Sequence, residues 1–117
     1  MGLATIMPSA PRTSHLVMSM SAEGPATVVA LHGEADIATL PLVTRMLDRA
    51  VRDHTGPVIV ELAESRFIDS GTVRLVSQAA QALGEQGRGL TIRSPSRTAV
   101  VVLDLFGLSD RIMTGEN

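Results

Sequence analysis

The chain has no cysteine and few aromatic residues. It contains no tryptophan, no tyrosine and two phenylalanines. Without thiols it has no disulfide framework, no cysteine nucleophile and no thiolate-bound zinc. Its three histidines, His15, His32 and His54, are too scattered for the usual spacing of zinc ligands. The sequence therefore predicts no metal site and no cofactor, and the lack of cysteine fits a cytoplasmic protein.

Charge is also scarce. Charged residues make up 19% of the 117 residues and the formal net charge is −2, so nothing attracts nucleic acid or an acidic membrane surface. No apolar run approaches the roughly 20 residues that a membrane span needs. Hydrophobic residues make up 44% of the chain, an ordinary globular proportion, and the length suits one domain. We expect a domain that binds neither nucleic acid nor membrane.

The two ends of the chain differ from its middle. Residues 1–14 contain Pro8, Pro11 and small polar residues, which predict a flexible leader. The patterned part of the chain spans residues 15–113, and residues 114–117 are expected to form a short tail. We expect the function to lie in the patterned part.

Hydrophobic patterning in the first half predicts a hairpin and a helix. Residues 16–20 and 26–32 predict two strands joined by a turn, with Gly33 ending the second strand. A helix follows with Pro41 in its first turn, because apolar residues then recur at helical spacing up to Val51.

The most informative segment is the strand and turn that follow. The β-branched residues 58–62 predict a short strand buried on both faces, and residues 67–68 are expected to anchor the next turn. From residue 72 apolar residues recur at helical spacing, which predicts a helix. The turn Asp69-Ser70-Gly71-Thr72 therefore places two hydroxyl side chains at a helix N-terminus, where we expect them to be exposed.

The last third predicts a strand, a helix and a short edge strand. The strand covers residues 90–93, Pro95 starts the helix, and Gly107 ends it. The end of this helix, residues 105–108, is expected to pack in the core. Residues 111–113 predict the edge strand.

Together these elements predict an α/β fold, a mixed sheet of four to five strands packed with helices. If the second and central strands are parallel, the loops that carry Asp36 and Asp69 emerge at the same edge of the sheet. That edge is the candidate site.

Three segments resemble the STAS domain, the fold of bacterial anti-sigma factor antagonists and of the cytoplasmic tails of sulfate transporters. They read LHGEADIAT (31–39), VIVELAESRFIDSG (58–71) and VLDLFGLSDRI (102–112). The resemblance implies a STAS-like fold and a protein that binds an anti-sigma factor, often a Ser/Thr kinase, and so frees a sigma factor for transcription. It also implies that phosphorylation of the antagonist turns binding off.

The turn departs from the family pattern at Gly71. The family usually has Asp-Ser-Ser-Gly or Asp-Ser-Thr-Gly, with the phosphoryl group on the hydroxyl residue before glycine. An alignment without a gap puts Gly71 at that acceptor position and Thr72 at the glycine position. A one-residue gap makes Ser70 the acceptor but turns every later helical residue by about 100°. We favour the ungapped alignment, and Ser70 and Thr72 both remain candidates for phosphorylation.

The resemblance also implies which residues face the partner. Acidic residues at the places of Asp36 and Asp69 line the kinase-facing surface in the family, and Arg74 occupies a polar position on the helix that follows. The simpler interpretation is that the side chains of the turn only cap the helix. The predicted partner-binding set is Asp36, Asp69, Ser70, Gly71, Thr72 and Arg74.

Two other functions stay open. Gly71 favours a STAS scaffold that cannot be phosphorylated and that assembles with similar domains, by self-association or in a sensory complex, or binds an anti-sigma factor constitutively. A Mg²⁺-dependent enzyme with Asp36 and Asp69 as ligands is the remote alternative. Because the chain has no phosphate-binding Gly-rich loop with Lys and no Gly-x-Ser-x-Gly elbow, the sequence predicts no enzyme and no catalytic residue.

Overall fold

The computed structural model describes residues 16–113. The predicted leader and tail, and His15, lie outside the described residues. The described part forms a five-stranded mixed sheet and three α-helices, which confirms the predicted fold class. Its elements are, in chain order, β1 (Leu16–Glu23), β2 (Ala26–Ala35), η3 (Ile37–Thr39), α1 (Leu40–Arg52), β3 (Val58–Glu61), β4 (Ser65–Ile68), α2 (Ser70–Glu85), β5 (Leu90–Arg93), α3 (Arg97–Leu105) and η4 (Ser109–Arg111).

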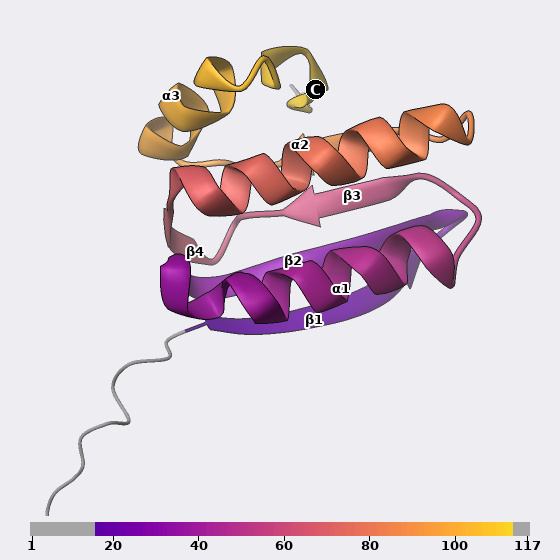
Figure 1. The fold of residues 1–117 in the computed structure, drawn as a ribbon, viewed down its shortest axis with the longest axis horizontal. Coiled ribbons are helices and arrows are strands. Elements are labelled where there is room, and N and C mark those ends of the chain that lie inside the picture. The colour runs from indigo at the N-terminus through magenta and orange to yellow at the C-terminus, as the bar shows by residue number, and fades with distance from the viewer. Residues whose placement is uncertain (1–15, 114–117) are drawn as a thin grey trace, which may run out of the picture.

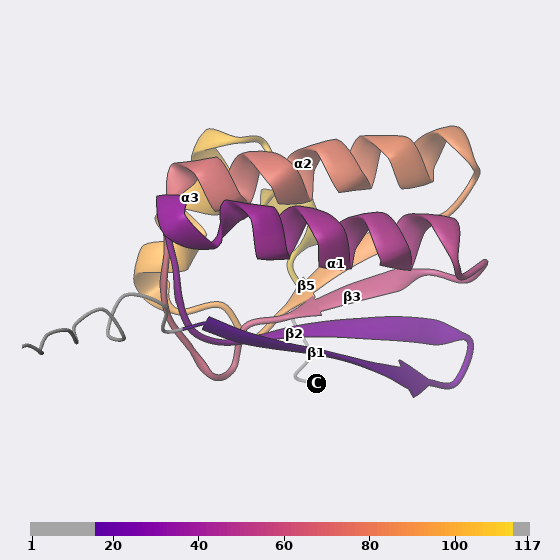
Figure 2. The same ribbon diagram turned by 60° about the horizontal axis from the view of Figure 1, so that its bottom comes forward.

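Two helices cover one face of the sheet. Figures 1 and 2 show α1 and α2 side by side on this face, and α3 beside the first half of α2. The main core fills the space between the sheet and these helices. Its sheet side chains include Val29, Leu31, Val58 and Val60, and its helix side chains include Val43, Leu47, Val76 and Leu83, all of them 5% exposed or less. Burying each such side chain contributes about 1.5–3 kcal/mol.

The long strand β2 organises the sheet. It pairs antiparallel with β1, as the predicted hairpin requires, and parallel with β3 through residues 27–30. Its last part, residues 33–35, pairs parallel with β4. The prediction that Gly33 ends this strand was wrong, because Gly33 adopts φ 113° at an irregularity in the β2–β4 register and the strand continues to Ala35.

The central strand β3 is buried on both faces, as predicted. Val58 and Val60 face the helices, whereas Ile59 packs with Ala26 and Val28 in a separate small cluster on the other face. On that face the Arg93 guanidinium bonds to Glu61 at 2.5 Å and to Glu23 at 2.7 Å. These two contacts tie β5 to β3 and to the hairpin.

The turn between α1 and β3 is held by the Arg88 side chain and packs closely against the backbone of the β1–β2 hairpin. Arg88 donates hydrogen bonds to the carbonyl oxygens of Val51 at 2.7 Å and Gly56 at 2.9 Å. A Cβ atom at Gly56 would lie 2.0 Å from the carbonyl oxygen of Pro25. The hairpin therefore packs against this turn at a distance that only glycine allows.

Three local predictions were wrong. Residues 67–68, which were expected only to anchor the next turn, belong to a strand, β4, that the sequence analysis did not predict. Arg111 lies in η4, and the predicted edge strand is reduced to one parallel bridge between Ile112 and Ile92. The end of the last helix packs only in part in the core, because Leu108 is 3% exposed but Leu105 is 77% exposed.

Candidate functional site: the turn before α2

The two predicted acidic residues follow strands that are direct neighbours. Ala35 of β2 pairs with Ile68 of β4, and the amide of Asp69 donates a 3.1 Å hydrogen bond to the carbonyl oxygen of Ala35. Asp36 and Asp69 thus leave the sheet at the same edge, as predicted. The strand that precedes Asp69 is β4, whereas the sequence suggested the central strand. Figure 1 shows this edge at the end of the molecule where η3, β4 and the first turn of α2 meet.

Asp36 is fixed by a local capping arrangement. Its Oδ1 accepts a hydrogen bond from the amide of Ala38 at 3.0 Å, and its own amide donates to Thr39 Oγ1 at 3.0 Å. Thr39 is 4% exposed, so this arrangement is anchored in the protein. Asp36 therefore directly follows the end of β2 and caps η3.

Asp69 is the N-cap of α2, and Thr72 supplies both of its partners. Asp69 Oδ1 accepts from the Thr72 amide at 2.9 Å and from the Thr72 hydroxyl at 2.8 Å. The Thr72 side chain is fully buried. The expectation that both hydroxyls of the turn are exposed was wrong for Thr72, since its side chain is buried and its hydroxyl donates to the Asp69 carboxylate.

Ser70 is the exposed hydroxyl of the turn. It is the first residue of α2, and its side chain makes no hydrogen bond within residues 16–113. The free amides of the first helical turn and the helix dipole make this position tolerant of negative charge. Ser70 is therefore the hydroxyl that an enzyme or a partner reaches without opening the fold.

Gly71, at the expected acceptor position, has room for a side chain. A Cβ atom there would lie 3.5 Å and 3.6 Å from the methyl carbons of Leu40 and 3.7 Å from Asp69 Oδ1, which are ordinary contact distances. The residue is helical and has no positive φ. Nothing in the packing thus requires glycine at this position.

Arg74 lies one turn further along α2 and is exposed. Its guanidinium carbon lies 5.7 Å from the centre of the Phe106 ring, a distance at which the cation and the ring attract each other. Through this contact the candidate site continues toward the end of α3. Arg74 is thus exposed on α2, and its role in binding stays a prediction.

Two exposed apolar side chains at this edge were missed by the sequence analysis. Ile37, in η3, is 78% exposed, and Phe67, in β4, is 52% exposed. Phe67 was expected to anchor a turn. A signal for Ile37 existed in the sequence, since it stands alone between the capping residues Asp36 and Thr39, where no helical face can bury it. Large apolar side chains exposed near polar ones are typical of surfaces that bind other proteins.

The described residues offer no metal centre. No group of three or more His, Cys, Asp or Glu side chains in residues 16–113 is placed to hold a metal ion. The Oδ1 atoms of Asp36 and Asp69 are both occupied by capping hydrogen bonds.

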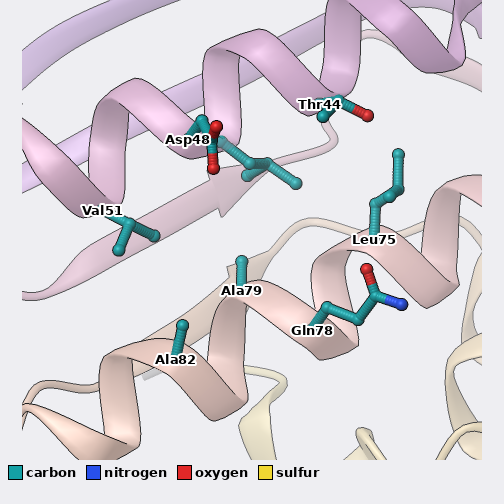
Figure 3. A pocket seen from close by; sticks show the side chains of 8 residues that line it. Thr44, Asp48, Val51, Leu75, Gln78, Ala79 and Ala82 are labelled. Carbon is teal, nitrogen blue, oxygen red and sulfur yellow. The ribbon is translucent and has the colours of Figure 1, made fainter.

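A shallow hollow lies between α1 and α2, along the middle of the two helices (Figure 3). Thr44 and Asp48 border it on α1 and Gln78 on α2, and the rest of its lining is apolar. Its volume is about 140 Å³, too small for a typical ligand pocket of about 300–1,000 Å³. It holds none of the predicted site residues. Its lining residues are Thr44, Leu47, Asp48, Val51, Leu75, Gln78, Ala79 and Ala82.

The family STAS_2, described as "Mlab, STAS domain", matches residues 18–114. This match covers most of the chain, which therefore belongs to the STAS domain family. No curated sequence matches the chain. No helix within residues 16–113 has the length and apolarity needed to cross a membrane.

Solved structures of anti-sigma factor antagonists have the same fold. An antagonist from Mycobacterium paratuberculosis is 19% identical, with a TM-score of 0.77 over 93% of this chain and 92% of that chain. The antagonist SpoIIAA in its unphosphorylated form is 21% identical, with a TM-score of 0.74 over 86% of this chain and 90% of that chain. The phosphorylated form of SpoIIAA from Bacillus is 21% identical, with a TM-score of 0.70 over 86% of this chain and 93% of that chain.

Proposed function

We propose that the protein is an anti-sigma factor antagonist, which binds an anti-sigma factor in the cytoplasm and so frees a sigma factor for transcription. The observation that carries this proposal is the placement of Ser70. It is exposed at the start of α2, directly after the capping residue Asp69, on a fold shared with antagonists. The proposed contact surface consists of Asp36, Asp69, Ser70, Gly71 and Arg74. Ile37 and Phe67 add exposed apolar area to it.

We propose Ser70 as the residue through which phosphorylation releases the partner. A phosphoryl group adds a charge of about −1.5 to −2 near neutral pH. The helix N-terminus tolerates that charge, so the fold stays intact. A partner that has buried the uncharged Ser70 side chain must instead desolvate the new charge, and a loss of a few kcal/mol weakens its binding by a hundredfold or more.

Thr72 is the weaker of the two candidates. Its hydroxyl is buried and already donates to Asp69, so a kinase would reach it only after the first turn of α2 opened. Phosphorylation of Thr72 would also remove the hydrogen bond that ties the helix to its cap.

The experiment combines mass and binding in the same samples. The purified chain is incubated with each anti-sigma factor of its host, with and without Mg-ATP, and the intact mass and the complex are recorded. We expect one added phosphoryl group together with loss of the complex, both abolished in Ser70→Ala and retained in Thr72→Val. Ser70→Glu should not form the complex even without ATP. Failure of every anti-sigma factor to bind the unmodified chain would refute the proposal.

Gly71 favours a second function, a constitutive antagonist or scaffold. The family's acceptor position carries no hydroxyl here, and Ser70 lies one residue before it. In that case the complex forms with or without ATP, no mass is added, and Ser70→Ala binds like the unmodified chain. The same samples therefore distinguish a regulated antagonist from a scaffold.

A further inference from the structure

We infer that α3 is a second part of the partner-binding surface, and that it binds a segment whose apolar residues are flanked by acidic ones. This inference rests on the proposed function for the identity of the partner but not for the chemistry of the surface. Its starting point is the exposure of α3, which the sequence analysis expected to end in the core.

Apolar side chains form an exposed stripe on α3. Val101 is 62% exposed and Leu105 is 77% exposed. They are four residues apart, so they lie one above the other on one face of the helix. Ala99 and Leu103 fill the opposite face and are 4% and 1% exposed. α3 thus uses one face for the core and leaves a second apolar face without a partner within residues 16–113.

Arginines stand at both ends of this stripe. Arg97 is the first residue of α3, and Arg74 lies over Phe106, the residue that follows the helix. Neither arginine forms an ion pair within residues 16–113. The acidic side chain on α3, Asp104, accepts a 2.6 Å hydrogen bond from Ser109. The rim of the stripe therefore carries two arginines and one carboxylate, a small excess of positive charge that an acidic partner neutralises.

The stripe is continuous with the candidate site. α3 packs against β4 and α2, the two elements that flank the Ser70 turn (Figure 1). Arg74 belongs to both regions, since it lies on α2 beside the turn and contacts the end of α3. A partner seated on Ser70 therefore reaches α3 without crossing another part of the molecule. Phosphorylation at Ser70 would act on one end of this surface and leave the α3 stripe unchanged.

Two variants of α3 and one matched control test the inference. Leu105→Ser removes the most exposed apolar side chain of α3, and Arg97→Glu reverses one charge of the rim. Val17→Ser is the control, because Val17 is 67% exposed on β1. All three side chains are exposed, so the variants should keep the far-ultraviolet circular dichroism spectrum and melting temperature of the unmodified chain.

The first probe is the anti-sigma factor that binds the unmodified chain. Leu105→Ser and Arg97→Glu should each weaken this complex by about tenfold or more, as expected for interface anchors, and Val17→Ser by less than about twofold. Equal affinity of both α3 variants and the unmodified chain, with Ser70→Glu still unable to bind, would overturn the inference and leave the proposed function standing.

The second probe does not depend on the function. It is a fluorescently labelled amphipathic helical peptide with leucines on one face and glutamates on the other, compared with the same peptide carrying lysines in place of glutamates. Fluorescence anisotropy should show binding of the acidic peptide to the unmodified chain, about tenfold tighter than that of the basic one and weakened by Leu105→Ser. Absence of that preference overturns the inferred chemistry. If no anti-sigma factor binds but the acidic peptide does, the proposed function fails and the inference about α3 stands.

A second copy of the chain is the other possible occupant. Sedimentation equilibrium of the unmodified chain and of Leu105→Ser shows whether a second copy of the chain binds the stripe. A dimer that Leu105→Ser dissociates would assign the stripe to self-association and overturn the acidic partner.

Discussion

One oxygen of Asp69 holds both the amide and the hydroxyl of Thr72, at 2.9 Å and 2.8 Å. The threonine therefore stabilises the first turn of α2 from inside the fold, while the serine two residues earlier stays exposed. The two hydroxyls of the turn thus have different roles, one structural and one available for contact.

Thr72→Val should lower the free energy of unfolding by about 1.5–3 kcal/mol, the usual contribution of a hydrogen bond to a carboxylate. Valine fills nearly the same volume, so the loss reports the hydroxyl and not a cavity. Urea denaturation followed by circular dichroism measures it, because the chain has no tryptophan or tyrosine to serve as a fluorescence signal. Ser70→Ala is the control and should change stability by less than about 0.5 kcal/mol. An equal loss of stability in Thr72→Val and Ser70→Ala would contradict the structural role of the Thr72 hydroxyl.

Gly71→Ala should leave the fold intact and raise the free energy of unfolding by up to about 1 kcal/mol, because glycine is the poorer helix former and the space beside Leu40 accepts a methyl group. Gly71→Ser adds a hydroxyl at the same place. A host anti-sigma kinase that leaves the unmodified chain unphosphorylated should add one phosphoryl group to Gly71→Ser and none to Gly71→Ala, as read from intact mass. A large loss of stability in Gly71→Ala would show that the turn needs glycine after all.

Gly56→Ala should destabilise the protein by several kcal/mol, or prevent folding, because its new methyl carbon would lie 2.0 Å from the Pro25 carbonyl oxygen. Gly84→Ala is the matched control. It lies near the end of α2 with no atom within 4 Å of the added carbon, so it should be neutral or stabilise by up to about 1 kcal/mol. Thermal melting of the two variants under the same conditions checks the contrast, which would be absent if the hairpin could move away.

The pairing of Glu23 with Arg93 should make stability depend on pH. The hydrogen bond from Arg93 lowers the pKa of Glu23 below its ordinary value. The unfolded chain therefore binds a proton at a higher pH than the folded chain does, and the stabilisation present above the ordinary carboxyl pKa is lost as the pH falls through the lowered value.

Glu23→Gln measures this contribution. It should lower the free energy of unfolding at pH 7, and the difference from the unmodified chain should shrink as the pH falls below the ordinary glutamate pKa and through the lowered pKa of the folded chain. Urea denaturation at pH 7 and pH 3 gives both values. A difference of the same size at both pH values would assign the effect to packing and not to charge.

Much of the fold follows from the sequence because its elements carry their own signals. The strand at residues 90–93 has the predicted bounds, and α1 begins beside Pro41 as expected. β4 was missed because its four residues, Ser65–Ile68, show a strand pattern only through their pairing with the extended end of β2. Non-local pairing of this kind leaves no periodic trace in such a short segment.

The candidate site could be located from the sequence, but not its chemistry. The shared edge for Asp36 and Asp69 was predictable from strand order. The burial of Thr72 was not, because a threonine at the start of a helix can direct its hydroxyl toward solvent or toward its cap. The exposure of Leu105 could not be predicted either. Apolar residues on both faces of α3 give the same sequence pattern as a helix that is buried all round.

The space beside Gly71 also bears on how easily the control of this protein could change during evolution. A glycine codon that ends in a pyrimidine becomes a serine codon by one base change, and the leucine side chain opposite would not have to move for the new residue to fit. Loss and return of a hydroxyl at this position would then cost the fold nothing, so that selection on signalling alone would decide whether residue 71 can accept a phosphoryl group.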